Sequence, residues 1–212
     1  EATKQLPMYL LLDTSASMTV SSVSRSKYSM AVHLAGGLAF AGLDRVSPVG
    51  LIGTGDRAIR IEPSLSRTRI LQWMHQLRRY RLDERTTLSD RLHELSTTLP
   101  NRALVIILSD LHEPEALPAL KLMGQRHDCA VIQLQDPAEA SLAGSGFFRG
   151  REAETGAEFV AHGQSRHMDT APLHAELKRH RVDHLLLRTD QPVEHPIRQF
   201  FSMRGLAGKA AR

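Results

Sequence analysis

The 212-residue sequence has little cysteine, few aromatic residues and no long hydrophobic run. Its single cysteine, Cys129, lies in an apolar segment, so we expect a core residue, no intrachain disulfide and a reducing compartment. Aromatic residues make up only 5% of the chain, which leaves no stacking platform for nucleic-acid bases. No run of about 18 apolar residues is present, and Glu1 to Lys4 carry no signal-peptide pattern. We therefore predict a cytoplasmic domain that contacts neither nucleic acid nor a membrane.

The length and composition predict a single domain. Hydrophobic residues make up 42% of the chain and charged residues 24%, which is ordinary for a globular protein. We expect this domain at residues 1–204, followed by a basic, flexible tail at residues 205–212. Because the sequence begins almost directly on an expected core strand, we expect a piece of a longer protein, whose upstream chain could carry a membrane anchor. The net charge of +4 comes from basic residues spread along the chain, which indicates solvated helix faces and helix ends.

Apolar segments typical of buried strands alternate with segments of helical periodicity. This alternation predicts an α/β fold with a doubly wound, mostly parallel, Rossmann-like sheet and helices on both faces. The segment 53–58 fits a dinucleotide-binding pattern, but the alternation at 58–62 indicates a hairpin turn and one antiparallel edge strand instead. A long loop is expected at 136–150 and a second hairpin at 151–161. Strands are expected at 9–12, 48–52, 58–62, 103–108, 130–134 and 184–187, and helices at 27–43, 66–81, 89–99, 114–126, 172–181 and 196–203.

Side chains with hard oxygen atoms follow two of the expected strands. Asp13, Ser15 and Ser17 alternate directly after the first strand, and Asp110 follows the very apolar fourth strand. In doubly wound sheets these two strands are usually neighbours, and ligands bind beyond their carboxyl ends, where the winding reverses. The loop that contains Thr86 can reach the same place. Because hard oxygen donors suit Mg²⁺, Mn²⁺ or Ca²⁺ rather than zinc, these residues predict a divalent-cation site.

Several short motifs carry a family resemblance. They are Asp13 to Met18, Arg85 to Leu88, Leu108 to Asp110, and Asp136 to Glu139 followed by Glu154 to Gly156. In this order they resemble the metal-ion-dependent adhesion site of von Willebrand factor A domains. The chain is more similar still, from Leu6 to about Arg204, to a bacterial branch known as domain of unknown function fifty-eight. The resemblance implies a von Willebrand factor A-like fold.

The same resemblance implies a ligand set and a partner. It assigns direct ligation of the ion to Ser15, Ser17 and Thr86, with Asp13 and Asp110 binding directly or through water. Mg²⁺ fits this set best, and its open coordination position would take an Asp or Glu carboxylate from a protein partner. Members of the branch accompany MoxR-type AAA+ ATPases, which implies such an ATPase as a partner and a chaperone-like or assembly role.

The residues around the expected ligands leave some alternatives open. Thr87 is an alternative to Thr86, which is preferred because it aligns with the family's threonine and leaves Thr87 to cap the following helix. We expect Thr87, His112 and Glu113 on the rim where a partner docks, although the last two also fit a solvated helix start. The arginines between positions 78 and 85 form a hypothesis of their own, namely that they steer an acidic partner towards the cation.

Other functions fit the residues less well. A phosphohydrolase of the Asp-x-Asp type needs a second carboxylate where Ser15 stands, and a receiver domain needs a lysine where Gln135 and Asp136 lie. The histidines at positions 162, 167, 174, 180 and 184 are irregularly spaced, so we expect surface residues and not a zinc site. We therefore predict a domain that is not an enzyme and that binds a protein through Mg²⁺. A metal-dependent phosphohydrolase and a metal-free scaffold are the alternatives.

Overall fold

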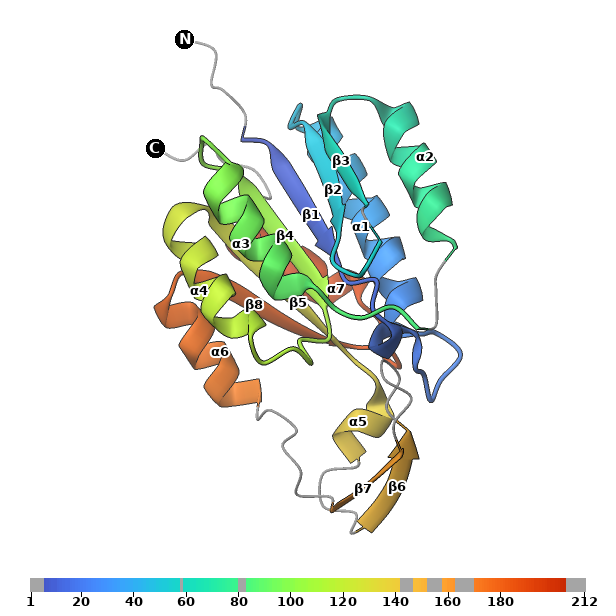
Figure 1. Ribbon diagram of the computed structural model, residues 1–212. Coiled ribbons are helices and arrows are strands. Elements are labelled where there is room, and N and C mark those ends of the chain that lie inside the picture. Colours follow the sequence, from blue (N-terminus) through green and yellow to red (C-terminus); the bar gives the residue numbers. More distant parts are fainter. Residues whose placement is uncertain are drawn as a thin grey trace.

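The computed structural model describes residues 6–57, 59–79, 83–141, 147–151, 158–162 and 170–204 (Figure 1). Strands and helices alternate along these residues, as the periodicity predicted. The strands are β1 (Met8–Leu12), β2 (Val49–Gly53), β3 (Arg60–Ser64), β4 (Leu104–Ser109), β5 (Asp128–Gln135), β6 (Phe147–Arg151), β7 (Glu158–His162) and β8 (Val182–Arg188). The helices are α1 (Lys27–Asp44), α2 (Arg67–Leu77), α3 (Leu88–Thr98), α4 (Ala116–Arg126), α5 (Pro137–Ser141), α6 (Thr170–Arg179), α7 (Glu194–Met203) and the short 3-10 helix η1 (Ala16–Thr19).

Six of these strands form one sheet in the order β3-β2-β1-β4-β5-β8. Neighbouring strands run parallel except for β2 and β3, which pair antiparallel at one edge. The prediction of a doubly wound, mostly parallel sheet with one antiparallel edge strand is therefore confirmed. The segment that fits the dinucleotide-binding pattern joins β2 to β3 and opens no helix. β6 and β7 pair antiparallel in a separate two-stranded sheet, which is the second hairpin that the sequence predicted.

Helices cover both faces of the main sheet. Along β1, Leu10 and Leu12 pack into a core with α1, α2 and α7, whereas Tyr9 and Leu11 pack into a second core with α3, α4 and α6. Figure 1 shows these helices on the two sides of the central strands. The contiguous apolar residues of β4 are buried on both faces, as expected for a central strand of a parallel sheet. Cys129 lies in the second core, as predicted.

The segment after β5 differs from the predicted long loop, because it contains α5 and the start of the β6–β7 hairpin. α5 begins with a capping box. The Asp136 carboxylate accepts a hydrogen bond from the Ala138 N–H at 2.9 Å, and the Glu139 carboxylate accepts one from the Asp136 N–H at 3.0 Å. The pattern Asp-Pro-Ala-Glu, with proline at the first helical position, signals this helix start. The loop prediction was wrong because it followed the glycine and serine residues further along the segment.

The remaining differences are small. α2 ends at Leu77 and not near residue 81. η1 (Ala16–Thr19) begins inside the first motif and extends into the expected polar loop, and its Thr19 hydroxyl donates to the Ala16 carbonyl at 2.7 Å. The motif at 154–156 and the expected tail at 205–212 lie outside the described residues. Of the helices in the described ranges, none combines the length and the apolar character needed to cross a membrane.

Candidate metal centre

The topology brings the two predicted aspartates to one edge of the sheet. β1 and β4 are parallel neighbours, with Leu12 in register with Leu108. The Asp13 N–H continues this pairing by donating to the Leu108 carbonyl at 2.9 Å, and Ser109 and Asp110 follow directly. The predicted adjacency of these strands is therefore confirmed, and it lies where the winding of the sheet reverses.

The loop after β1 turns its oxygen-bearing side chains towards one another. One carboxylate oxygen of Asp13 accepts a hydrogen bond from the Ser15 N–H at 3.0 Å, and the other accepts one from the Ser109 hydroxyl at 2.5 Å. The hydroxyl oxygens of Ser15 and Ser17 lie 3.0 Å apart. Asp13 and Ser15 are buried and Ser17 is half-buried. The alternating spacing of these three residues thus gives three side chains that face the same place.

The second aspartate completes this group from β4. Asp110 is buried, and the Ser17 hydroxyl lies close enough to its carboxylate to lower its pKa. Burial and the negative charge of Asp110 raise the pKa of Asp13 from its ordinary value to about 7. Burial also acts to raise the pKa of Asp110, but the neighbouring His112 and Lys27 side chains outweigh it and hold the pKa of this carboxyl below its usual value. The two carboxylates therefore lie close enough to repel each other in a buried place.

The loop that carries Thr86 reaches the same edge of the sheet. The Ala16 N–H donates to the Glu84 carbonyl at 2.7 Å, and Thr86 forms an isolated β-bridge with Gly55, which follows β2. The Thr86 hydroxyl donates to the Glu113 carboxylate at 3.3 Å. Four of the five predicted ligands thus lie close together where β1 and β4 end, while Thr86 lies on an adjoining loop.

A buried carboxylate that the sequence analysis missed fastens this loop to the first motif. Glu84 accepts hydrogen bonds from the Thr14 hydroxyl at 2.9 Å, from the Arg57 N–H at 3.0 Å and from the Arg57 Nε at 2.8 Å. Its side chain is 1% exposed. Because Thr14 belongs to the first motif and Glu84 lies two positions before Thr86, these contacts fix the two loops relative to each other. In the sequence, Glu84 stands out only because it belongs to an acidic pair, Asp83 and Glu84, within an arginine-rich stretch.

The predicted rim residues have different environments. Thr87 is the N-cap residue of α3, as predicted, but its hydroxyl donates to the Gly55 carbonyl at 3.1 Å and makes no capping hydrogen bond. The Glu113 carboxylate accepts the Ser89 N–H in the first turn of α3 at 3.2 and 3.3 Å. The His112 side chain is 48% exposed, which places it at the surface beside the buried aspartates. A role of these residues in partner docking stays a prediction.

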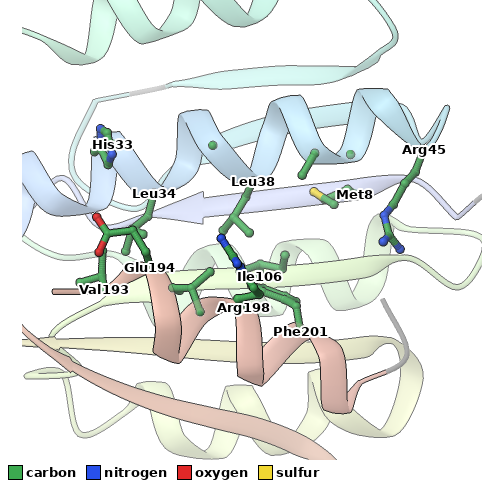
Figure 2. Close-up of a pocket in the computed structure, with 14 residues that line it drawn as sticks. Met8, His33, Leu34, Leu38, Arg45, Ile106, Val193, Glu194, Arg198 and Phe201 are labelled. Carbon is green, nitrogen blue, oxygen red and sulfur yellow. The ribbon is translucent and has the colours of Figure 1, made fainter. Parts of the chain in front are cut away.

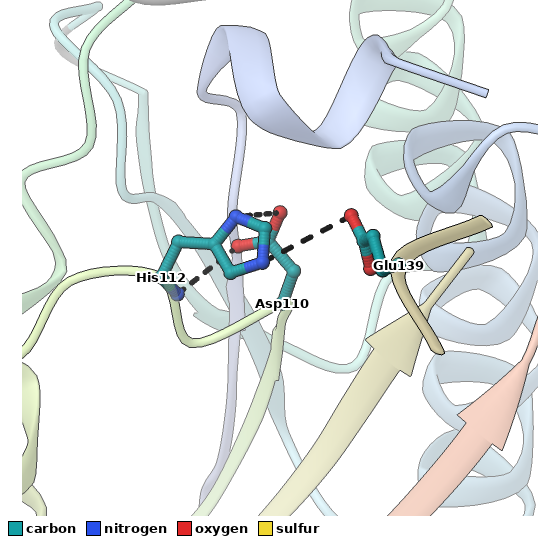
Figure 3. Close-up of side chains that lie close together, drawn as sticks. All are labelled: Asp110, His112 and Glu139. Atoms are coloured by element: carbon teal, nitrogen blue, oxygen red, sulfur yellow. Dashed lines mark hydrogen bonds and ion pairs between the residues drawn. The ribbon is translucent and has the colours of Figure 1, made fainter. Parts of the chain in front are cut away.

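A second group of charged side chains adjoins Asp110 (Figure 3). Ligand atoms of Asp110, His112 and Glu139 lie within 4.8 Å of one another. The Lys27 ammonium forms ion pairs with both carboxylates, with that of Asp110 at 2.8 Å and with that of Glu139. The positive charge between these two carboxylates is therefore already supplied by a side chain of the protein, Lys27. Lysine in the first turn of a helix is disfavoured by the helix dipole, which was the one sequence signal for an unusual role of Lys27.

One of the histidines expected on the surface is buried. His184 of β8 lies 2.9 Å from the Gln133 side-chain oxygen, and the Gln133 side-chain nitrogen donates to the Asp110 carbonyl at 3.3 Å. Burial and the neighbouring His174 lower the pKa of His184 to about 4, so the imidazole is neutral. The prediction was wrong for this residue because the alternation of β8 places His184 on the same buried face of the sheet as Val182. His174 is exposed as expected, His180 is half-buried, and the side chains at 162 and 167 lie outside the described residues.

An apolar pocket of about 370 Å³ lies elsewhere, between α1 and α7 (Figure 2). Leu34, Leu38, Val193 and Phe201 are among its lining residues, with Arg198 beside them. None of the predicted ligand or rim residues lines this pocket. It is therefore separate from the polar edge that carries Asp13 and Asp110.

The residues at that edge fit a divalent cation. Asp13 and Asp110 offer two carboxylates that repel each other, and Ser15 and Ser17 offer two adjacent hydroxyl oxygens. A divalent ion relieves such repulsion, and carboxylate and hydroxyl oxygens are ligands that Mg²⁺ and Ca²⁺ accept. The Asp110, His112 and Glu139 group fits less well, because Lys27 already supplies positive charge to both of its carboxylates.

The fold, with polar loops at this edge, is that of a von Willebrand factor A-like domain. The conserved hypothetical protein BatB from Bacteroides thetaiotaomicron has a similar structure, with a TM-score of 0.59 and 15% identity over 95% of this chain and 98% of that chain. The SpRpn10 VWA domain is similar with a TM-score of 0.56 and 10% identity, over 92% of this chain and 95% of that chain. A von Willebrand factor type A structure from Catenulispora acidiphila has a TM-score of 0.51 and 11% identity, over 94% of this chain and 42% of that chain.

Within that class, the chain belongs to the family described as protein of unknown function DUF58, whose model matches residues 1–182. The family predicted from the sequence motifs is therefore confirmed. No curated protein matches the chain. At the identities found, the solved structures show the fold alone.

Proposed function

We propose that this domain binds Mg²⁺ through Asp13, Ser15, Ser17, Thr86 and Asp110 and uses the ion to engage a carboxylate of a protein partner. The observation that carries the proposal is that Asp13, Ser15, Ser17 and Asp110 gather at one place, where β1 and β4 end. Mn²⁺ and Ca²⁺ are alternatives for the same donors. The domain acts by binding a partner and is not an enzyme.

The chemistry of the donors favours docking over bond breaking. Asp13 is oriented by the Ser109 hydroxyl and the Ser15 N–H, so its carboxylate needs little rearrangement to meet an ion. The hydroxyl ligands add oxygen atoms without adding charge, and Mg²⁺, when bound, supplies further positions that favour an anionic oxygen. A phosphohydrolase of the Asp-x-Asp type would need a carboxylate at Ser15, whose hydroxyl instead contacts that of Ser17.

The partner that we propose is a protein segment with an accessible Asp or Glu side chain. The exposed Arg78, Arg79 and Arg85 lie just before or within the loop that carries Thr86, and their charge favours the approach of an acidic segment. Membership of the DUF58 family supports a MoxR-type AAA+ ATPase as the associated system, in a chaperone-like or assembly role. We place this activity in the cytoplasm, in keeping with the single, buried, unpaired cysteine.

One observation favours a second candidate, a scaffold that works without metal. The Lys27 ammonium already neutralises part of the charge of Asp110 at 2.8 Å. If this ion pair were sufficient, the polar edge would be stable on its own and Mg²⁺ would have no effect on folding or on partner binding.

A metal titration tests the proposal. Thermal unfolding and phosphatase activity would be followed with increasing Mg²⁺ for the wild type, Asp13→Ala and the control Asp44→Ala, which removes an exposed carboxylate. We expect Mg²⁺ at about 100 times its Kd to stabilise the wild type and the control by about 3 kcal/mol, or roughly 6–12 °C, and to leave Asp13→Ala unchanged. Turnover that Asp13→Ala abolishes would overturn the proposal in favour of the phosphohydrolase. An absence of stabilisation, also with a glutamate-rich peptide present, would overturn it in favour of the scaffold.

A further inference from the structure

Lys27 is a buried cation placed where a helix disfavours positive charge. It is the first residue of α1, its side chain is 1% exposed, and its ammonium bonds the Asp110 carboxylate at 2.8 Å and the Glu139 carboxylate. The positive end of the helix dipole and the loss of hydration both oppose a charge there. The two carboxylates therefore account for its position.

We propose that Lys27 is a tethered cation that competes with the divalent ion for Asp110 and thereby sets the metal affinity of the site. This inference rests on the proposed function, because it concerns the same ligand set. Without a divalent ion, the ammonium supplies the positive charge that Asp110 requires in a buried place. When the ion binds, Lys27 withdraws from Asp110 and stays with Glu139.

The contacts of Asp110 support competition between the two cations. One oxygen of its carboxylate meets both the Lys27 ammonium at 2.8 Å and the His112 Nδ1 at 3.3 Å, and the other accepts the His112 N–H at 3.3 Å. A divalent ion that binds this carboxylate has to share it with the ammonium or displace the ammonium from it. Because two cations that share one buried carboxylate repel each other, the ammonium weakens the binding of the ion.

Glu139 gives the displaced ammonium a second partner. Its other carboxylate oxygen accepts the Asp136 N–H at 3.0 Å, which keeps Glu139 fixed at the start of α5. Asp136 in turn accepts the Ser22 N–H at 2.8 Å, in the loop that leads to α1. Lys27 can therefore leave Asp110 without becoming an unpaired buried charge. Metal binding is then linked to the segments around Ser22 and α5, which adjoin the same edge.

Calorimetric titration with Mn²⁺ as the probe tests this inference. We expect Lys27→Met to bind Mn²⁺ at least tenfold more tightly than the wild type, because the competing charge is gone. Lys27→Arg keeps the charge and is expected to keep the low affinity. Glu139→Gln is expected to weaken binding severalfold, since Lys27 then has Asp110 as its remaining carboxylate. The matched control is Lys121→Met, which removes a remote lysine paired with Glu176 and is expected to leave the affinity unchanged.

Competition predicts that Lys27→Met and Glu139→Gln change the Mn²⁺ affinity in opposite directions, and this separates it from a merely structural role of Lys27. If Lys27 only held Asp110 in place, Lys27→Met and Glu139→Gln would both weaken Mn²⁺ binding, and the inference would be wrong. Lys27→Gln, which stays polar, is measured alongside Lys27→Met, and circular dichroism checks that each variant folds. If the wild type binds Mn²⁺ and Asp13→Ala does not, but neither neutral variant binds more tightly, only the role of Lys27 is overturned. If no protein in the series binds Mn²⁺, the proposed function fails as well.

Discussion

Glu84 is expected to be a sensitive residue outside the predicted ligand set. Its carboxylate accepts hydrogen bonds from the Thr14 hydroxyl and from two groups of Arg57, and its side chain is 1% exposed. Glu84→Ala leaves the buried Thr14 hydroxyl without this acceptor and the guanidinium of Arg57 without its carboxylate. Breaking a buried ion pair on one side costs about 3–5 kcal/mol.

The expected loss lies at the lower end of that range, because Arg57 can be hydrated in part. Its side chain is 23% exposed and it also donates to the Arg79 carbonyl at 2.8 Å. We therefore expect Glu84→Ala to lower the free energy of unfolding by about 3 kcal/mol, which corresponds to roughly 6–12 °C in Tm for a chain of this size. Glu84→Gln keeps the size and part of the hydrogen bonding, so about half of that loss is expected.

Urea denaturation monitored by circular dichroism measures these differences. The matched control is Glu94→Ala, which removes a carboxylate that pairs with Arg60 and Arg91 at the surface, where its side chain is 39% exposed. Surface pairs of this kind contribute about 0–1 kcal/mol. If Glu84→Ala were no more destabilising than Glu94→Ala, the argument that Glu84 fastens the two loops together would be refuted. We also expect Glu84→Ala to weaken Mg²⁺ binding, since Thr86 loses its support.

Three further predictions concern Asp13, the loop that carries Thr86, and the packing of α4. The pKa of Asp13 is raised to about 7, so the metal-free fold binds this proton more tightly than the unfolded chain and loses stability as pH rises from the ordinary carboxyl range towards 7. Since Mg²⁺ needs the ionised carboxylate, calorimetry at several pH values should give about tenfold tighter binding at pH 8 than at pH 6, and a flat profile would contradict this. Thr86→Val should weaken Mg²⁺ binding tenfold or more while Thr87→Val leaves it within about twofold; the reverse order would make Thr87 the ligand. Gly124→Ala should destabilise the fold by about 1–3 kcal/mol in thermal unfolding, because the added Cβ would overlap the His180 carbonyl oxygen, and an unchanged Tm would show that the backbone yields there.

The fold could be predicted from the sequence because each strand and helix has its own periodicity. The apolar run of β4 and the alternation after β2 are local patterns, and the order of the elements then restricts the topology to a doubly wound sheet. The same argument brings Asp13 and Asp110 to one edge, since both follow the carboxyl ends of strands that such sheets place side by side.

The charged groups around the predicted ligands could not be found in this way. Lys27 lies 83 positions from Asp110 and 112 positions from Glu139, and Glu84 lies 70 positions from Thr14. A local pattern shows that such a residue is unusual, as a lysine in the first turn of α1 is, but it does not identify its partner. The partners depend on loop conformations at the sheet edge, which the periodicity of strands and helices does not determine.

The most direct test of the central claim is a crystal structure of the protein grown with Mn²⁺, with anomalous diffraction used to locate the ion. The account predicts an anomalous peak in bonding contact with the hydroxyl oxygens of Ser15, Ser17 and Thr86, with Asp13 and Asp110 bound directly or through water. A peak between Asp110, His112 and Glu139, or no peak at the carboxyl end of β1, would contradict it.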